Sequence, residues 1–406
     1  MNKIIFICRN YGDPKSACGI CVKNLVDEFQ LRNFEIWVIS VTKEPIKELL
    51  DSKEIHYSYV KEGWFTTFNR QSKLRTGLLN SVLFKLVYLI RLPYVLLNFP
   101  ILSKRLKTDL TSHLRDLIKN NGIYYVVGTN SPFEPIQATI DIKKEFGTGI
   151  KAVCYHLDPV LLQDNKSKAI NLYKDKRSYV AVTEEANVVD LILAQQSTKG
   201  LISKPNIEYV DFPLFIKNDT IEESGVKFSS DYVNITYVGT LDEDNRNPQF
   251  FLDLLNDVYR KTKKQTLLHI WGFIRESATV ERLKTCPFVI YHGMIEPTKI
   301  MDILLKSDFL LNISNLQSYN AVPSKIFQLF STKKPIINVV RHPEDFAKQY
   351  FEKYPSVLVI EEYRHIAEPL NLVKYIEDNY GKSIELPDNI YETSTPEYIS
   401  DLIIGE

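Results

Sequence analysis

An apolar helical pattern is preceded by three residues whose types and order are suited to binding an anion. Pro323, Ser324 and Lys325 directly precede the apolar residues of the segment 326–330. Proline is favoured at the first position of a helix, where backbone N–H groups without helical partners can bind a phosphate. The lysine adds an ammonium charge that would stabilise a departing diphosphate. The pattern predicts a phosphate site, and the alternative is an ordinary helix start with a surface lysine.

A second pair of residues could perform acid–base or hydroxyl-binding chemistry. His156 and Asp158 follow a short apolar run that is typical of a buried strand. A histidine can orient a bound molecule, and an aspartate can bind a hydroxyl or assist its deprotonation. The alternative is a simple strand-end turn, because an aspartate before Pro159 is common turn chemistry. We predict that both side chains lie where an acceptor substrate enters.

The elements that must position these residues alternate between strand and helix. In the first half of the chain, the predicted strands are residues 3–8, 34–41, 123–128, 151–156 and 178–183. After the first strand, apolar residues recur at helical spacing from Val22 to Phe29, which predicts a helix. Another helix is expected from about Pro135, and a third contains Val188, Leu191 and Ile192. This alternation predicts a doubly wound parallel sheet.

A second series of the same kind follows a polar segment at 211–230, which has the composition of a linker. Its predicted strands are residues 233–239, 267–273, 288–293, 308–314 and 335–340. One helix is predicted at 250–258 and another that ends at about residue 306. The sequence therefore predicts an α/β protein of two Rossmann-like domains facing across a cleft, 1–212 and 213–385, with a helical tail at 386–406 that packs back on the first domain. Ligands of such sheets bind beyond the carboxyl ends of the strands.

Composition limits the compartments and partners. The 406 residues carry 50 basic and 50 acidic side chains, so no overall field would attract nucleic acid, and we expect none as a partner. Five cysteines scattered along the chain favour reduced thiols in the cytoplasm, and the pair Cys18 and Cys21 is weak evidence for a metal or redox site. The first residues read as a strand and not as a signal peptide.

Four segments, taken in order, resemble the GT-B glycosyltransferases of family four. They are residues 8–40, with a strand, a glycine-bearing loop and a helix, and residues 237–255, 290–314 and 320–337. The resemblance implies transfer of a sugar, with retention, from a nucleotide-sugar donor to a lipid-linked or polysaccharide acceptor in cell-surface glycan synthesis. The nucleotide-sugar would be a substrate, and neither a cofactor nor a metal is expected.

The resemblance also implies roles for single residues. Gly19 and Gly239 would let the backbone approach the donor, and Arg246, with Ser324 and Lys325, would contact its diphosphate. His156 and Asp158 would be the catalytic, acceptor-side residues.

Three positions depart from the pattern of the family. Gln328, three residues after Lys325 and on the same helix face, stands where similar enzymes bind the ribose with a glutamate, and Asn320 stands near their second acid. Thr240 also replaces an arginine that similar enzymes often carry. An amide accepts a hydrogen bond but brings no charge. The departures leave open a non-catalytic relative that binds a glycan or pairs with an active transferase, and a sugar-nucleotide epimerase is a third hypothesis.

One segment of this neutral chain carries basic charges only. Residues 70–108 contain no Asp or Glu, and Lys85, Arg91, Pro93 and Pro100 interrupt the apolar run, which disfavours a spanning helix. Apolar side chains could enter the lipid headgroup boundary while the flanking basic residues meet anionic lipid. These are Arg70, Lys73, Arg75, Lys104, Arg105 and Lys107. We expect a peripheral protein at the inner face of the cell membrane, and the alternative is a pair of core helices with a basic end.

Overall fold

The chain forms two compact α/β units. The computed structural model describes residues 2–14, 16–63, 78–159, 168–215, 222–366, 368–387 and 390–406. Unit 1 comprises Met1–Pro213 together with Thr393–Glu406, and unit 2 comprises Leu214–Glu392. The last residues of the chain therefore belong to the first unit.

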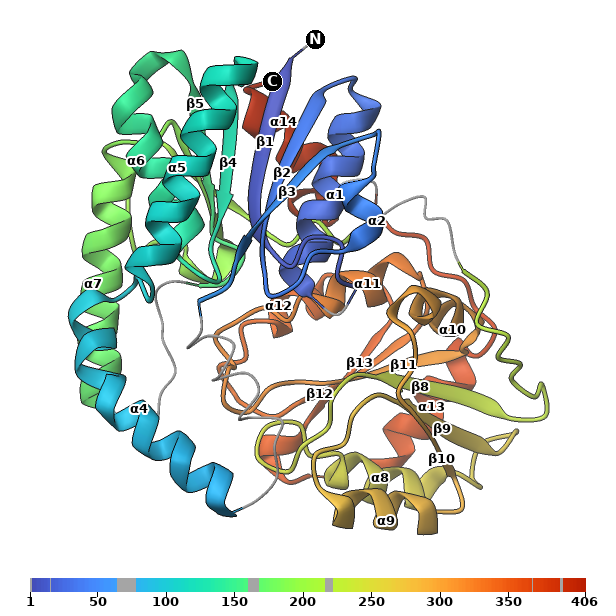
Figure 1. Cartoon of the computed structure of the whole chain (residues 1–406). Helices are drawn as coiled ribbons and strands as arrows, with labels where there is room; N and C mark the ends of the chain where they lie inside the picture. Colours follow the sequence, from blue (N-terminus) through green and yellow to red (C-terminus); the bar gives the residue numbers. More distant parts are fainter. Residues whose placement is uncertain are drawn as a thin grey trace. The chain divides into compact units, whose positions relative to one another are not determined.

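Among its described residues, unit 1 has a seven-stranded parallel sheet in the order β3-β2-β1-β4-β5-β6-β7 (Figure 1). The strands are β1 (Lys3–Arg9), β2 (Glu35–Thr42), β3 (His56–Lys61), β4 (Tyr125–Thr129), β5 (Lys151–Tyr155), β6 (Leu191–Gln195) and β7 (Ile207–Val210). The helices are α1 (Ala17–Leu31), α2 (Lys47–Leu50), α4 (Leu78–Asn98), α5 (Lys104–Asn121), α6 (Glu134–Phe146), α7 (Lys168–Ala186) and α14 (Pro396–Ile404).

Helices cover both faces of this sheet, so its central strands read as continuous apolar runs. In β1, Ile5 and Ile7 pack in one buried cluster with residues of α5 and α6. The alternate residue Phe6 contacts Phe29 of α1 on the other face, with ring centroids 5.7 Å apart. α14 packs against α1, where Arg32 pairs with Asp401 at 2.5 Å.

Unit 2 has a six-stranded parallel sheet among its described residues, in the order β10-β9-β8-β11-β12-β13. The strands are β8 (Val233–Val238), β9 (Thr266–Trp271), β10 (Val289–Gly293), β11 (Phe309–Ile313), β12 (Ile336–Val340) and β13 (Val357–Glu361). The helices are α8 (Gln249–Val258), α9 (Ser277–Thr285), α10 (Ile300–Lys306), α11 (Lys325–Ser331), α12 (Lys348–Glu352) and α13 (Pro369–Asn379).

Both sheets contain a point at which the strand order reverses. In unit 2, β8 to β10 extend to one side and β11 to β13 extend to the other, so the reversal lies between β8 and β11. In unit 1 it lies between β1 and β4. Loops that leave two adjacent strands toward opposite sides open a crevice beyond their carboxyl ends, which is the usual ligand site of open parallel sheets.

Two neighbouring sequence predictions are wrong. Residues 178–183, predicted as a strand, belong to α7, and Leu191 and Ile192, predicted in a helix, belong to β6. The valine-rich composition favours a strand, but the buried residues Ser178 and Val182 are four apart, as on one face of a helix. The other predicted strands are confirmed, while β3, β7 and β13 were not predicted.

Candidate functional site

The loop after β8 and the start of α11 meet in unit 2. Gly239, the first residue after β8, has φ of +151°, a conformation that favours glycine. A Cβ atom at this position would lie 3.3 Å from Nζ of Lys325 and 3.2 Å from the hydroxyl of Tyr237. The same ammonium lies 4.7 Å from the centroid of the Tyr237 ring. Gly239 and Lys325, predicted to act on one ligand, are therefore neighbours.

Positive charge is concentrated at this point. Burial of the ammonium, and after it the charge of Arg246, hold the pKa of Lys325 well below its ordinary value. Burial raises the pKa of Tyr237 to about 12, and Arg246 opposes that rise. An anion bound beside Lys325 and Arg246 would favour the protonated form of Lys325.

Arg246 is held at the reversal point of the sheet. Its backbone N–H and C=O pair with Asp242 at 3.0 and 3.3 Å, which folds the loop after β8 back on itself. Its Nε donates to Oδ1 of Asn315, just beyond β11, at 2.6 Å. This acceptor is a neutral amide, so it leaves the guanidinium charge without compensation at that contact.

The other predicted donor residues lie on the same side of unit 2. Ser324 precedes α11 with helical backbone angles and makes no capping bond through its side chain. Gln328 is partly exposed and lies one helical turn beyond Lys325. Asn320 stands in the turn that joins β11 to α11, where the N–H of Ala321 donates to the carbonyl of Ser318 at 3.2 Å.

Gly19 has a local packing role in unit 1. A Cβ atom there would lie 2.1 Å from the carbonyl oxygen of Asn10, so any other residue would displace the loop after β1. Its N–H donates to Oγ of Ser16, the N-cap of α1, at 3.1 Å. The close approach at Gly19 thus involves the chain's own backbone.

His156, which was predicted to lie where an acceptor enters, is buried. It follows β5, and its Nε2 lies 2.8 Å from Oε1 of Glu185 on α7, which is also buried. Sequence reasoning missed Glu185 because residues 178–183, directly before it in α7, were predicted as a strand. The helical spacing from Ser178 and Val182 would have indicated that Glu185 faces inward.

Asp158 is the exposed member of the predicted pair. Its Oδ2 accepts a hydrogen bond from Oγ of Ser131, which follows β4. Asn130 accepts from the N–H of Asp158 at 3.0 Å and donates to its carbonyl at 2.5 Å. These bonds fix the loop after β5 against the loop after β4 and leave the carboxylate at the carboxyl edge of the sheet.

The described residues contain no group of three or more His, Cys, Asp or Glu side chains placed to hold a metal ion. Cys18 lies with its Sγ 3.6 Å from Oγ1 of Thr129. Burial raises the pKa of both the Cys18 and the Cys21 thiol, which favours the protonated form.

Comparisons with known proteins find likeness at the level of structure. No protein-family model matches the sequence, and no curated protein is significantly similar to it. The apo lipopolysaccharide outer core galactosyltransferase WaaB is 15% identical, with 99% of each chain covered and a TM-score of 0.51. The UDP-GlcNAc 2-epimerase of Methanocaldococcus jannaschii is 10% identical, with 100% of each chain covered and a TM-score of 0.58. HepE of Anabaena, solved with UDP, is 12% identical, with 99% of this chain and 96% of that chain covered and a TM-score of 0.53.

These neighbours share the GT-B fold, and the likeness runs over the whole chain. Two parallel-sheet α/β units in one chain are therefore the GT-B architecture that the sequence predicted. Because a transferase and an epimerase are both among the neighbours, the fold does not select one reaction.

Proposed function

We propose that the protein is a glycosyltransferase that moves a sugar from a nucleotide-sugar donor to a lipid-linked or polysaccharide acceptor, with retention, in cell-surface glycan synthesis. One observation carries the proposal. Lys325, Gly239 and Arg246 converge beyond the carboxyl ends of β8 and β11, at the reversal point of the sheet. Two cations close together at this edge of the sheet suit a diphosphate, which is the leaving group of a nucleotide-sugar.

In this proposal the donor is held chiefly by unit 2. The Lys325 ammonium and the Arg246 guanidinium offset the charge that develops on the diphosphate as the glycosidic bond breaks, so no metal is required. Gln328 and Asn320 would contact the ribose as amides, each accepting a hydroxyl hydrogen bond without charge.

The acceptor is assigned to unit 1. Asp158 is exposed at the carboxyl edge of the sheet and could bind or orient an acceptor hydroxyl. Buried His156 acts behind it by fixing the loop after β5 to α7 through Glu185.

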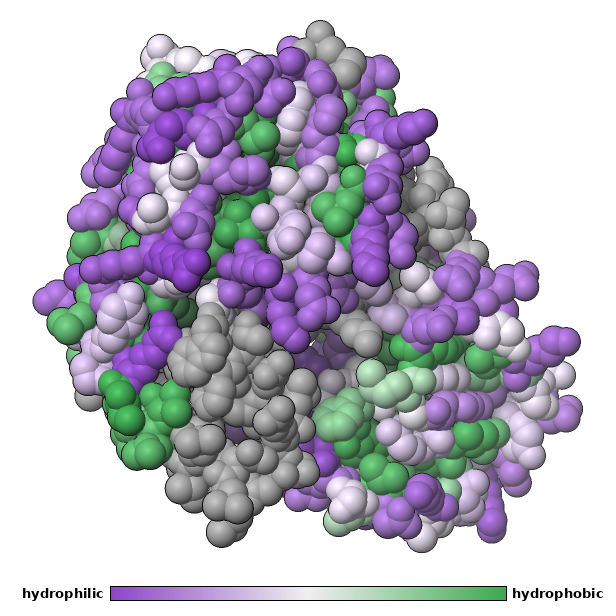
Figure 2. Space-filling model, viewed as in Figure 1, coloured by the Kyte–Doolittle hydropathy of each residue, from purple (hydrophilic) through white to green (hydrophobic). Residues whose placement is uncertain are grey.

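We also propose that unit 1 binds an anionic membrane through α4 and the start of α5. Leu89, Ile90 and Leu97 of α4 are 61%, 73% and 71% exposed. The carboxyl end of α4 contacts α7, where the hydroxyl of Tyr173 donates to the carbonyl of Leu96 (Figure 1). Figure 2 shows hydrophobic side chains gathered over this part of unit 1. At these positions the exposure speaks against the alternative of a core helix pair.

Basic side chains accompany the apolar ones. Lys104 and Arg105 at the start of α5 are exposed, and Lys107 pairs with Asp141 at 2.9 Å. Arg70, Lys73 and Arg75 lie outside the described residues, as does the side chain of Lys85. No helix among the described residues is both long and apolar enough to cross a bilayer. Exposed cationic and aliphatic groups on one unit suit the headgroup region of an anionic bilayer, and we propose that the protein is peripheral at the cytoplasmic face.

A second candidate is a non-catalytic relative that binds a glycan or accompanies an active transferase, because Asn320 and Gln328 bring no negative charge. A third is an epimerase, because an epimerase is among the structural neighbours.

One experiment separates the three candidates. Purified protein is incubated with radiolabelled UDP-, GDP-, ADP- and CDP-sugars together with a membrane extract, and label is followed into lipid, polysaccharide and free sugar-nucleotide. Transfer that is lost in Lys325→Ala supports the proposal. Nucleotide binding without transfer would favour the non-catalytic relative, and an epimerised soluble sugar-nucleotide would favour the epimerase.

A further inference from the structure

We propose that Asn245, tied to Arg341 and Glu362, is a positioning residue that holds Arg246 in place for the donor diphosphate. The inference rests on the proposed function of that site and adds residues that sequence reasoning did not select. Neither Asn245 nor Arg341 is expected to touch the donor. Their effect would pass through the conformation of the loop after β8.

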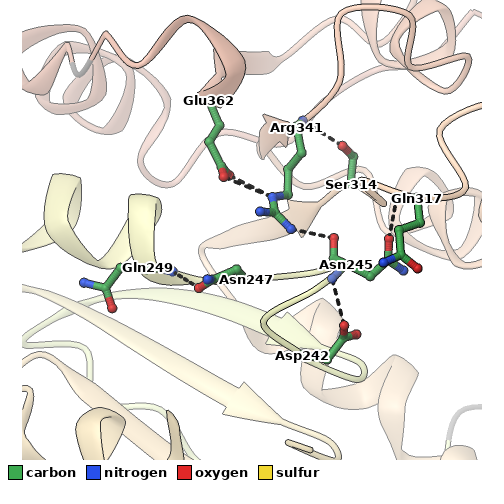
Figure 3. A network of polar contacts seen from close by, with 8 residues as sticks. All are labelled: Asp242, Asn245, Asn247, Gln249, Ser314, Gln317, Arg341 and Glu362. Atoms are coloured by element: carbon green, nitrogen blue, oxygen red, sulfur yellow. Dashed lines mark hydrogen bonds and ion pairs between the residues drawn. The ribbon is translucent and has the colours of Figure 1, made fainter. Parts of the chain in front are cut away.

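Every polar group of Asn245 is bonded, and three of its bonds reach the loop after β11. Figure 3 shows its bonds with Asp242, Gln317 and Arg341. Its Nδ2 donates to Oδ1 of Asn315 at 3.2 Å, and its Oδ1 accepts from the N–H of Gln317 at 2.9 Å. Its carbonyl accepts from the N–H of Leu316 at 3.1 Å. Its own N–H donates to Oδ1 of Asp242 at 2.8 Å, within the loop after β8.

Arg341 makes a charge-assisted hydrogen bond to the backbone of Asn245 and an ion pair with Glu362. Its Nη1 donates to the carbonyl of Asn245 at 2.7 Å, and its Nε lies 3.0 and 3.2 Å from the two carboxylate oxygens of Glu362. Its backbone N–H donates to Oγ of Ser314 at 3.0 Å. The guanidinium is largely buried, which strengthens its ionic hydrogen bonds relative to those of a surface pair.

The network joins four consecutive strands of the sheet. Asn245 follows β8, Ser314 follows β11, Arg341 follows β12 and Glu362 follows β13, and these strands are neighbours in that order. It therefore spans the reversal point between β8 and β11, which is where a ligand is expected. The far end of the loop is also fixed, because Oδ1 of Asn247 accepts from the N–H of Gln249 at the start of α8, at 2.9 Å.

Asn245 is linked to donor binding because it and Arg246 donate hydrogen bonds to the same atom. Oδ1 of Asn315 accepts from Nδ2 of Asn245 and from Nε of the adjacent Arg246. Fixing Asn245 thus fixes both the backbone that carries Arg246 and the atom that holds its guanidinium. A guanidinium already in place loses little side-chain entropy when an anion binds, whereas a loose one must be ordered by the ligand.

A double-mutant cycle tests this coupling. Wild type, Asn245→Ala, Arg246→Ala and the double variant are titrated by calorimetry with the tightest-binding diphosphate among UDP, GDP, ADP and CDP, and with its monophosphate. We expect Asn245→Ala to weaken diphosphate binding about tenfold, as for the loss of one charge-assisted hydrogen bond. We expect a much smaller effect on the monophosphate, and a double variant no weaker than Arg246→Ala alone.

Glu362→Gln provides a variant that keeps the packing and removes only the charge. It should weaken diphosphate binding in the same direction, with a lower melting temperature, because the buried Arg341 guanidinium loses its charged partner. Additive losses from Asn245→Ala and Arg246→Ala would overturn the inference, as would equal losses for monophosphate and diphosphate, or unchanged binding in both Asn245→Ala and Glu362→Gln. If wild type binds none of the diphosphates, the proposed function fails together with the inference.

Discussion

Nε2 of His156 lies 2.8 Å from Oε1 of Glu185, and both side chains are buried in unit 1. The second carboxylate oxygen, Oε2, has no hydrogen-bond partner among the described residues. The imidazole therefore provides a hydrogen bond to the buried Glu185 side chain, and the pair joins the end of β5 to α7. Losing one partner leaves the other as a buried polar group without that hydrogen bond, which costs more than the bond itself contributes.

Glu185→Ala should accordingly reduce the free energy of unfolding by about 1 to 3 kcal/mol. Urea denaturation followed by circular dichroism measures this change. The matched control is Glu184→Ala, because Glu184 is the preceding residue of α7 and is exposed. We expect the control to change stability by about 0.5 kcal/mol or less. Equal effects of the two substitutions would show that the buried pair does not stabilise unit 1.

Lys325→Ala should weaken nucleoside diphosphate binding by about 1.5 to 3 kcal/mol, the range for a hydrogen bond to a charged group. Isothermal calorimetry measures the affinity. Lys333→Ala serves as the control, because Lys333 is exposed just beyond the same helix. Unchanged affinity in Lys325→Ala, with a normal melting temperature, would remove this lysine from the donor site.

The same lysine should impose a pH dependence on stability. Its pKa is lowered in the folded protein, first by burial and then by Arg246, so between that pKa and about 10.5 the unfolded chain binds more protons than the native one. Lys325 therefore costs stability below its folded pKa, and this cost diminishes as the pH rises toward the ordinary lysine pKa. Lys325→Met should stabilise the ligand-free protein at neutral pH, and the gain should shrink at alkaline pH. Melting temperatures of the two proteins across this range test the sign, and a destabilised Lys325→Met at neutral pH contradicts it.

The sequence predicts the strands well where helices cover both faces of a sheet, because burial on both faces gives continuous apolar runs such as β1 and β11. It fails at α7, since buried Ser178 and Glu185 interrupt the apolar pattern of the inward helix face. Gly239, Arg246 and Lys325 could be grouped from the sequence only by resemblance. Their proximity in space follows from the strand order. The contacts of Asn245 depend on the conformations of loops, which no periodic pattern in the sequence indicates.

The exposed face of α4 should be required for membrane binding. Replacing Leu89, Ile90 and Leu97 together by serine removes three aliphatic side chains from the surface, and we expect binding to anionic liposomes to fall by at least about tenfold. Flotation with phosphatidylglycerol vesicles at low salt measures it. Leu31→Ser is the matched control, because Leu31 of α1 is 80% exposed on another helix of unit 1.

The salt dependence of liposome binding separates the contribution of the basic residues from that of the aliphatic residues. The basic residues act through screened electrostatics, so wild type should float less at 1 M salt, where the Debye length is about 3 Å. Lys104→Gln with Arg105→Gln should reproduce part of this loss at low salt. A wild-type protein that never floats, or a triple serine variant that floats as well as wild type, would refute the proposed surface.

Gln328→Glu should tighten nucleoside diphosphate binding if this position contacts the ribose. A carboxylate accepts hydroxyl hydrogen bonds about twice as strongly as a neutral amide, which predicts a gain of roughly three- to tenfold in affinity. The new charge would also lie one helical turn from Lys325 and favour its protonated form. Comparing the nucleoside diphosphate with inorganic pyrophosphate separates the two effects, because only the nucleotide has a ribose. Gln328→Ala should weaken the nucleotide and leave pyrophosphate unchanged. A gain for pyrophosphate as large as that for the nucleotide would mean that residue 328 acts on the lysine and not on the sugar of the nucleotide.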